Sequence, residues 1–411
     1  MKTKLILALI CLVLISACQQ DDPTPTATDL PTPPAAETST TLPIATETTT
    51  PTLRPLPIDT VTPLPPPPTA QIQATSTLAP TPTPSPTPTP VQLLSADDFG
   101  MDRSPFTGRI VEDTDNLLRR PLAVKISNWP AAQVRPQSGL SQADIVFEHM
   151  AEGATRFTAI FHSQTPPDLG SIRSARLIDL ELPVMYDAAL VYSGASNGVN
   201  AQLAQSSFRG RQLRSAGDGY YRTGEDKPYE HTFFAHPDQL WESLEEREQN
   251  TPPDISNFMP FDEVPPENGE PANALEVRYR NTTVNWTYDP EAGLYMREAD
   301  GEPHLDANTD EQLASANVVV LFVYHDLNRD ICENVVNGVC TAYSLEIRLW
   351  DEGEALFFRD GQVYEARWVR PGTNALLTLQ TEDGDPLPFQ IGNTWFQVLS
   401  LLDEESVTVT P

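Results

Sequence analysis

Short apolar runs separated by turn residues dominate the chain from residue 121 onward, and their period predicts strands more often than helices. Residues 121–128 and 143–149 are compact apolar runs, and 154–163 alternates its side chains as a strand does. Residues 189–192 form another apolar run, which leads through small residues into a helix beginning near Val199. Strands that alternate with helices predict a layered α/β arrangement here.

Two further helices are expected in this half of the folded region. One spans 175–187 and is interrupted or kinked at Pro183, because proline removes a backbone donor. The other spans 237–247 and starts on Pro237, a position that suits the fixed backbone angle of proline.

Beyond residue 271 almost every segment has the pattern of a strand, and Asp-Gly, Asp-Pro and Pro-Gly pairs separate the segments. The predicted strands are 274–280, 284–289, 294–298, 318–325, 343–350, 355–359, 363–369, 375–379 and 394–399. The stretch 250–271 is rich in Pro, Asp, Glu and Asn, which marks a domain boundary. The sequence therefore predicts an α+β protein, with a layered α/β N-terminal head domain at 96–262 and a mainly antiparallel β domain at 263–411.

The first residues have the pattern of a lipoprotein export signal. Lys2 and Lys4 precede an apolar run at 5–15 that is too short to span a bilayer comfortably, and small residues lead to Cys18. We interpret 1–17 as a signal peptide and Cys18 as the lipidated residue; an ordinary signal peptide with a chance cysteine is the alternative. The predicted location is extracytoplasmic, with a lipid anchor at Cys18 holding the protein to the bacterial cell membrane.

Residues 18–95 are predicted to be a disordered tether. Between residues 23 and 90, 20 Pro and 21 Thr leave no aromatic side chain from which a core could be built. An extended chain at about 3.1 Å per residue would reach at most about 200 Å. The tether would hold the folded head away from the membrane, and its Thr/Pro tracts are also suited to O-glycosylation.

The charge of the chain is unevenly distributed. The formal net charge is −31, yet residues 119–227 hold 12 basic and 10 acidic side chains. Nucleic acid is excluded as a partner by the acidic remainder, because phosphate binding needs a cationic face. The cationic segment predicts either an anion pocket or internal ion pairs between its arginines and the protein's own carboxylates.

A small-residue turn at 193–198 is the candidate site in this segment. It lies between a predicted strand and a predicted helix, where backbone N–H groups are left to receive a negative atom. The candidate ligand-binding residues are Arg156, Arg173, Arg176, Ser193, Gly194, Ser196, Arg222 and His231. Arg173 and Arg176 suit a phosphate or carboxylate, or else pair with Asp144, Glu148 or Glu152.

The turn also matches the pattern G-x-S-x-G of a nucleophile elbow. A serine hydrolase would use Ser196 as nucleophile and His231 or His236 as base, oriented by Asp218 or Asp238. The same small residues are needed at any such turn for backbone geometry alone. Ser196 and His231 are therefore catalytic candidates, and whether the protein is an enzyme stays open.

Cysteine and histidine spacing predicts a disulfide and no metal site. Cys332 and Cys340 flank a short loop and, outside the cytoplasm, suit a disulfide; a metal site with His325 is the alternative. His149, His162 and the 304–306 trio match no metal signature. The chain has no P-loop and no dinucleotide fingerprint, so no cofactor is predicted.

Several strings in the head resemble a known family. They are RPLAV at 120–124, PQSGLSQADIV at 136–146, EG at 152–153, TRF at 155–157, IRSAR at 172–176, GEPHLD at 301–306, NVVV at 317–320 and DG at 360–361. Together they resemble the YerB-like lipoproteins, a domain-of-unknown-function family. The resemblance implies a lipid-anchored, two-part α+β head and no assigned activity. Tyr192 and Glu230 depart from the His and Pro that members tend to carry there, which weakens any catalytic role that needs them.

The sequence thus favours a cell-surface lipoprotein that binds an anionic or polyhydroxylated envelope ligand, such as a cell-wall glycan or polyphosphate fragment, through an arginine-rich pocket. Two alternatives stay open: a serine hydrolase acting through Ser196, and an envelope assembly or scaffold lipoprotein without a small-molecule site.

Overall fold

The computed structural model describes residues 100, 102–214, 216–402 and 405–411. The signal peptide at 1–17, Cys18 and the tether up to residue 95 lie outside the described residues, so those expectations stay predictions. Within the described ranges, no helix is long and apolar enough to cross a membrane.

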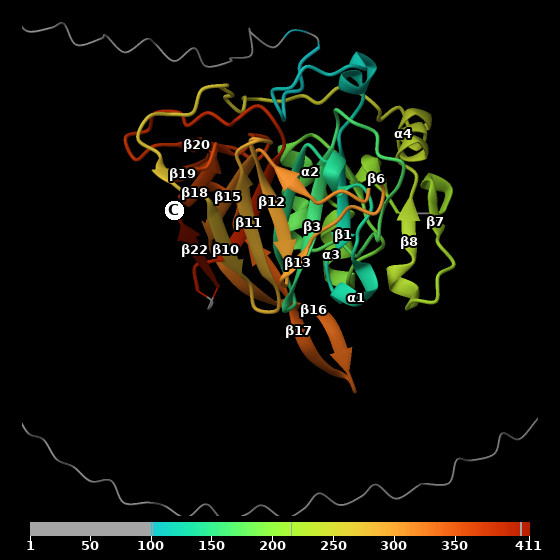
Figure 1. Cartoon of the computed structure of the whole chain (residues 1–411). Coiled ribbons are helices and arrows are strands. Elements are labelled where there is room, and N and C mark those ends of the chain that lie inside the picture. Colours follow the sequence, from blue (N-terminus) through green and yellow to red (C-terminus); the bar gives the residue numbers. More distant parts are fainter. Residues whose placement is uncertain (1–99, 101, 215, 403–404) are drawn as a thin grey trace, which may run out of the picture. The chain divides into compact units, whose positions relative to one another are not determined.

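An eleven-stranded sheet forms the centre of the fold (Figure 1). Its order is β20-β19-β18-β15-β21-β2-β3-β1-β5-β6, and β9 pairs with β19 outside this path. The strands are β1 (Leu122–Ser127), β2 (Ile145–Ala151), β3 (Ala154–Phe161), β5 (Ala189–Val191), β6 (Gln212–Leu213), β9 (Glu270–Pro271), β15 (Asn317–Val323), β18 (Asp351–Arg359), β19 (Gln362–Arg370), β20 (Thr378–Gln380) and β21 (Thr394–Ser400). Both β2 and β15 pair in parallel with β21, so the sheet is continuous across the two halves of the sequence.

The central strands are apolar on both faces because both faces are covered. Strands β1, β2 and β21 are buried at every position. Along β15, Val318 and Val320 face one core cluster while Val319 and Leu321 face another. This is why these strands read as continuous apolar runs rather than as alternating ones.

A second, six-stranded sheet covers one face of the first. Its strands are β10 (Ala274–Arg278), β11 (Thr283–Asp289), β12 (Leu294–Ala299), β13 (Glu302–Pro303), β14 (Ala314–Ser315) and β22 (Ser406–Thr410). Inward-facing Trp286 packs edge-on against Trp395 of β21, with ring centroids 5.3 Å apart. Buried and accessible positions alternate along β10 and β12, as expected where one face of a sheet meets the core.

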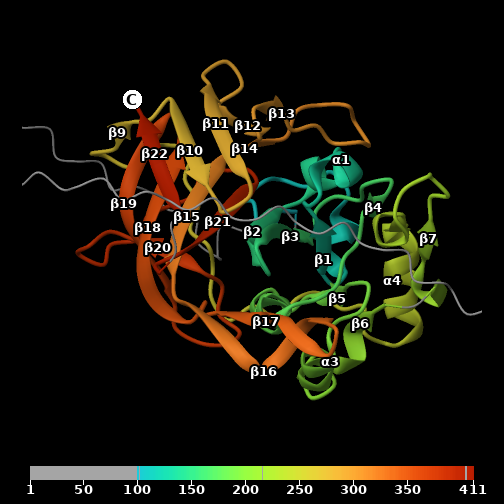
Figure 2. The ribbon, with the colours of Figure 1, turned by 90° about the horizontal axis from the view of Figure 1, so that it is seen from below.

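Two smaller β units complete the fold. Strands β4 (Leu169–Gly170), β7 (Tyr220–Arg222) and β8 (Phe233–Ala235) form a three-stranded sheet. Strands β16 (His325–Val336) and β17 (Val339–Ile347) form a hairpin that extends beyond the sheets in Figure 1 and lies beside α3 in Figure 2. The predicted disulfide between Cys332 and Cys340 joins its two strands, with Cα atoms 5.8 Å apart.

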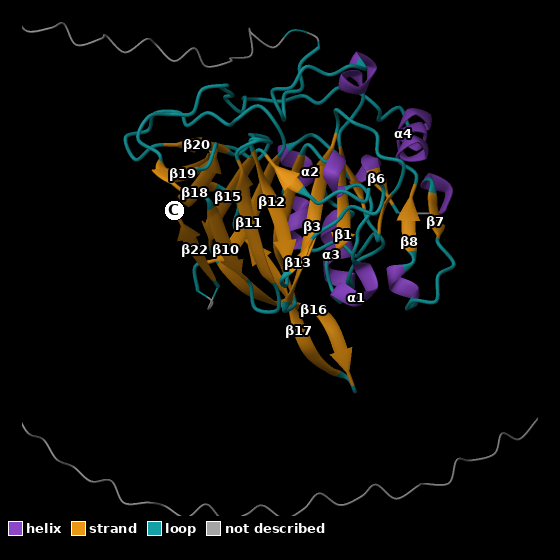
Figure 3. Ribbon diagram, in the orientation of Figure 1, coloured by secondary structure: helices purple, strands orange, loops and turns teal. Residues whose placement is uncertain are grey.

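The helices are short and few in the described chain (Figure 3). They are α1 (Ala131–Val134), α2 (Leu182–Met185), α3 (Asn197–Leu203) and α4 (Pro237–Glu246), with 3₁₀ turns η2 (Thr114–Leu118), η3 (Leu140–Gln142), η4 (Leu177–Leu180), η5 (Arg209–Arg211), η6 (Ala216–Asp218) and η7 (Tyr229–His231). The expected helix at 175–187 is instead the pair η4 and α2, and Pro183 lies in the first turn of α2. The predicted fold class is confirmed: an α/β N-terminal half and a mainly antiparallel β C-terminal half.

Candidate functional site

The small-residue turn follows β5 and ends at α3, as the sequence predicts. Ser196 is the N-cap of α3, and its Oγ accepts a hydrogen bond from the Val199 backbone N–H at 3.4 Å. Gly194 has φ +100°, a region that favours glycine, and a Cβ added there would meet nothing within 4 Å. The turn at Gly194 therefore borders open space.

Backbone hydrogen bonds hold the arginine-bearing segment 172–176 beside this turn. The Ser193 N–H donates to the carbonyl of Arg173 at 3.0 Å, and the Ala175 N–H donates to Gly194 at 2.8 Å. On its other side, the Ile172 N–H donates to the Phe233 carbonyl at 2.7 Å. The segment thus joins the turn to the chain just after η7, which carries His231.

Arg176 is already paired with acids of the protein itself. Its Nη2 donates to Glu152 Oε2 at 2.6 Å, its Nε also contacts Glu152, and Glu333 Oε2 lies 3.5 Å from Nε. Burial disfavours the charged guanidinium, but the hydrogen bonds and charge of Glu152 outweigh it and raise the pKa of Arg176. Of the acids proposed from the sequence, Glu152 is the partner.

Arg156 shares the same acid more loosely. Its Nη1 donates to the Ser174 carbonyl at 2.8 Å, and its Nη2 lies 3.4 Å from Glu152 Oε2. Burial and then the nearby Arg176 lower the pKa of Arg156. Two of the three clustered arginines therefore share the carboxylate of Glu152.

Arg173 differs from the other two. Its Nε is buried without a hydrogen-bond partner, and the pKa of its guanidinium is lowered by burial first and by Arg176 among its neighbours. His231, only 4% exposed, likewise has an Nδ1 without a partner, and burial followed by the charge of Arg173 lowers its pKa. A neutral imidazole thus lies near a guanidinium that has spare N–H capacity, and the backbone of that arginine hydrogen-bonds to the turn.

The hydroxyl of Ser196 is engaged by an acid rather than by a base. It donates to Glu333 Oε1 at 3.0 Å, and Glu333 belongs to the distant strand β16. His236 is held by Asp168, with Nδ1 2.9 Å from Oδ1, and stacks on Tyr221. Within the described residues, no hydrogen bond joins Ser196 to a histidine, so the arrangement gives the hydrolase alternative no support.

A fluorophosphonate probe is accordingly expected to leave Ser196 unlabelled. Among the described residues no histidine is hydrogen-bonded to the serine, whose hydroxyl donates to Glu333 and caps a helix. Incubating the full chain with the probe and mapping adducts by mass spectrometry checks this. Labelling of the wild type that disappears in Ser196→Ala would restore the hydrolase reading.

Arg222 does not face the turn. Its Nη1 donates to the Tyr229 carbonyl, and its guanidinium carbon lies 3.3 Å from the centroid of the Tyr229 ring and 4.7 Å from that of Phe233. These ring contacts account for its position in the three-stranded sheet.

The remaining candidate histidines belong to buried hydrogen-bond networks. His149 Nε2 lies 2.8 Å from Lys125 Nζ, and His304 accepts from Arg297 Nε at 3.0 Å. His162 Nε2 lies 3.2 Å from the Arg119 carbonyl. Burial lowers the pKa of all three imidazoles. In the part of the chain that the structure describes, no group of three or more His, Cys, Asp or Glu side chains could hold a metal ion.

Two ion pairs at the centres of these networks were not identified from the sequence. Lys125 pairs with Asp179, and Arg297 pairs with Glu148, and all four side chains have no solvent exposure. The Lys125–Asp179 pair lies near the arginine cluster, because the charges of Arg156 and Arg176 lower the pKa of Lys125. No local pattern reveals such pairs, because their members are far apart in the chain.

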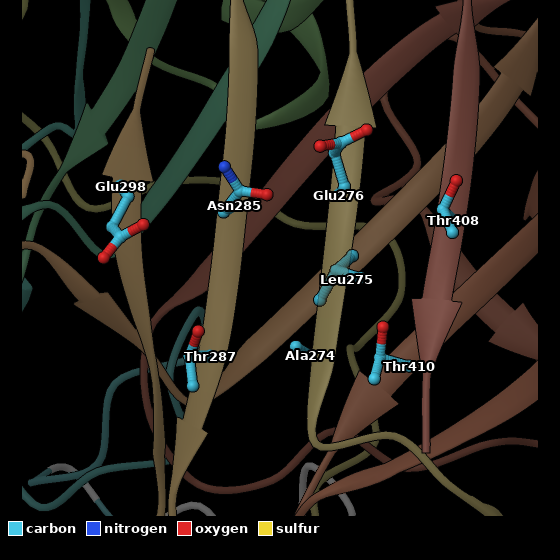
Figure 4. Close-up of a pocket in the computed structure, with 8 residues that line it drawn as sticks. All are labelled: Ala274, Leu275, Glu276, Asn285, Thr287, Glu298, Thr408 and Thr410. Atoms are coloured by element: carbon cyan, nitrogen blue, oxygen red, sulfur yellow. The ribbon is translucent and has the colours of Figure 1, made fainter. Parts of the chain in front are cut away.

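A shallow depression of about 370 Å³ lies on the six-stranded sheet (Figure 4). It is lined by Ala274, Leu275, Glu276, Asn285, Thr287, Glu298, Thr408 and Thr410. Strand register places Glu298, Asn285, Glu276 and Thr408 in one row across four strands. None of the predicted site residues lines it, and its polar side chains are those of a solvent-facing sheet.

Comparisons with known proteins cover almost the whole described head. A family model described as "Protein of unknown function (DUF3048) N-terminal domain" matches residues 106–250, and its C-terminal domain matches 275–396. A Bacillus subtilis (strain 168) protein named "Putative lipoprotein YerB" is 33% identical over 322 residues, which cover 74% of this chain and 88% of that protein. The crystal structure of YerB from Bacillus subtilis is similar, with a TM-score of 0.62 and 29% identity, covering 74% of this chain and 99% of that one.

Proposed function

The chain belongs to the DUF3048 family, and from that premise we propose that it is an extracytoplasmic lipoprotein whose head binds an anionic group of the cell envelope beside the turn at 193–198. Two independent observations support the anchoring. The leader has the charged, apolar and small-residue order that ends at Cys18, and the related YerB carries the name of a lipoprotein. Acyl chains on Cys18 would anchor the head without a spanning helix.

The unpaired groups beside the turn carry the binding proposal. Buried polar atoms are nearly always hydrogen-bonded, so one that is not calls for an explanation. Arg173 Nε and His231 Nδ1 both lack a partner, the charge of Arg173 acts on His231, and the backbone of Arg173 hydrogen-bonds to Ser193 of the turn. An anionic oxygen or a hydroxyl of a bound polymer would satisfy both, since the guanidinium donates and the neutral imidazole donates or accepts.

Arg173→Ala is expected to weaken binding of soluble peptidoglycan fragments by about 10- to 100-fold, the worth of a hydrogen bond to a charged group. Arg176 is the wrong residue to remove first, because Glu152 would then be left buried without its main partner. Calorimetric titration of the full chain in detergent measures the change, with inorganic polyphosphate as a second probe for a phosphate ligand.

The matched control is Arg209→Ala, which removes an exposed arginine from the same cationic segment. It should leave affinity for either probe within about twofold, because an exposed charge contributes little at short range. The proposal would be overturned if the wild type and a folded Arg173→Ala variant bound both probes with equal affinity. It would also be overturned if neither the wild type nor any variant with an intact turn bound either probe.

A scaffold role is the second candidate, and the hairpin tip is the observation that favours it. Val335, Val336 and Val339 are 60%, 49% and 64% exposed at the end of β16–β17. Exposed apolar side chains grouped on a projecting element suit contact with another protein. If Arg173 proves irrelevant to binding, crosslinking from the hairpin tip in cells tests this second function directly.

A further inference from the structure

The β16–β17 hairpin contacts the turn through two neighbouring side chains. Ile331 joins the apolar cluster around α3 and lies against Gly198, where an added Cβ would come within 2.7 Å of it. Glu333 reaches both Ser196 and Arg176. At 331–333 the hairpin is therefore docked on the proposed site by one apolar contact and one carboxylate, while its base packs into the main core through Leu345 and Ile347.

Glu333 occupies the position that a ligand carboxylate would take. Its side chain is only 2% exposed, Oε1 accepts from Ser196 Oγ at 3.0 Å, and Oε2 lies 3.5 Å from Arg176 Nε. Arg176 is already held by Glu152 through two nitrogen atoms, so Glu333 is its second and more distant acid. Withdrawal of Glu333 would leave Arg176 charged and paired with Glu152, and would free the Ser196 hydroxyl beside that guanidinium.

The construction of the hairpin allows such withdrawal. Strands β16 and β17 pair only with each other in the described sheets, so undocking breaks no backbone ladder to the rest of the protein. The register of the pair is irregular between Asn328 and Val335, around Glu333 itself. The disulfide between Cys332 and Cys340 would keep the two strands joined once the docking contacts are lost.

We propose that Arg176 and Ser196 form a carboxylate subsite, and that Glu333 fills it as an internal competitor until a carboxylate-bearing ligand displaces the hairpin. The inference rests on the proposed function, because the same ligand would reach the unpaired groups of Arg173 and His231. A carboxylate is favoured over a phosphate because the group now seated there is a carboxylate. Ligand and hairpin then exclude each other. The apparent affinity for the ligand falls in proportion to the fraction of molecules in which the hairpin is withdrawn from the subsite.

Glu333→Gln is the direct test, because glutamine keeps the shape and an acceptor for Ser196 while removing the charge. Affinity for soluble peptidoglycan fragments, which carry carboxylates, is expected to rise by about 5- to 30-fold, because the charge-assisted contact of Glu333 no longer competes with the ligand. Affinity for polyphosphate is expected to change less than about threefold. Asp330→Asn is the matched control: it removes an exposed carboxylate from the same strand and should change neither affinity.

Hydrogen exchange of the full chain supplies a second measurement that does not depend on a variant. Saturation of the wild type with the fragments should speed exchange of the backbone amides at 329–336, because the docked strand is released. The competitor role of Glu333 would be overturned if fragment binding depended on Arg173 but Glu333→Gln did not change the affinity and the fragments did not speed exchange at 329–336. The proposed function would then still stand. Absence of binding in both wild type and Glu333→Gln would overturn both. A larger gain for polyphosphate than for the fragments would overturn the carboxylate assignment.

Discussion

Replacing Arg297 with leucine is expected to lower the free energy of unfolding by about 3–5 kcal/mol, because it leaves a buried carboxylate without its partner. Arg297 is fully buried in β12, and its Nη2 donates to Glu148 Oε2 at 2.9 Å. Its guanidinium carbon also lies 4.7 Å from the ring centroid of Trp395. Glu148 would keep neutral donors such as Asn128 and Thr155.

Urea unfolding measures this change, and the same sheet offers a control. Arg278 of β10 pairs with Glu276 at 2.7 Å, but its side chain is 60% exposed. Arg278→Ala should therefore cost less than about 1 kcal/mol. Replacing Glu148 and Arg297 together with leucine should recover much of the loss in stability, because neither charge of this pair then remains buried. An Arg297→Leu variant as stable as Arg278→Ala would contradict the account.

Lys125→Met is the second large effect, with an expected loss of about 3 kcal/mol at pH 7. Lys125 Nζ lies 2.8 Å from Asp179 Oδ2, and neither side chain is exposed. Removing the ammonium leaves Asp179 with the Thr158 hydroxyl and the Arg176 backbone N–H as donors. Lys227→Met is the control, since its pair with Glu225 at 3.1 Å is partly exposed.

The same lysine predicts a dependence of stability on pH. Burial, opposed by Asp179, lowers the pKa of Lys125 from 10.5 to about 8. Between these two pH values the folded protein has released the proton while the unfolded chain still binds it, so unfolding takes up a proton. The free energy of unfolding of the wild type should thus rise, relative to that of Lys125→Met, by about 3 kcal/mol from pH 8 to pH 10.5. A constant difference between the two proteins across that range would contradict the assigned pKa.

Local sequence patterns were sufficient to predict those elements whose structure depends on residues that are neighbours in the chain. The turn after β5 could be predicted because an apolar run, small residues and a helix follow one another, and Ser196 takes the capping position. Strand β16 was missed because Asp326, Asn328 and Asp330 interrupt its apolar pattern, which an exposed hairpin tolerates. Pro183 is predicted to interrupt or kink the helix at 175–187, and the structure has an interruption: Pro183 lies where a new helix begins, so its missing N–H has no consequence.

Contacts between distant residues could not be predicted in the same way. The sequence predicts that the arginines near 156–176 form either an anion site or ion pairs; in the structure Arg176 pairs with Glu152, whereas Arg173 Nε has no partner. Glu333 and Ser196 are hydrogen-bonded although they are 137 positions apart in the sequence, and Arg297 and Glu148 are 149 positions apart. A single sequence carries no periodicity that relates such positions, so only the fold could bring them together.

The position of β21 also determines when this protein finishes folding. Residues 145–148 of β2 pair with 394–397, so a strand synthesised early waits for one that is synthesised much later. Until then β2 and β15 each present an open, largely apolar edge, and such edges attract other chains. The polypeptide therefore needs shielding until β21 is available, and a copy truncated before residue 394 should be cleared by proteases rather than accumulate as a smaller working protein.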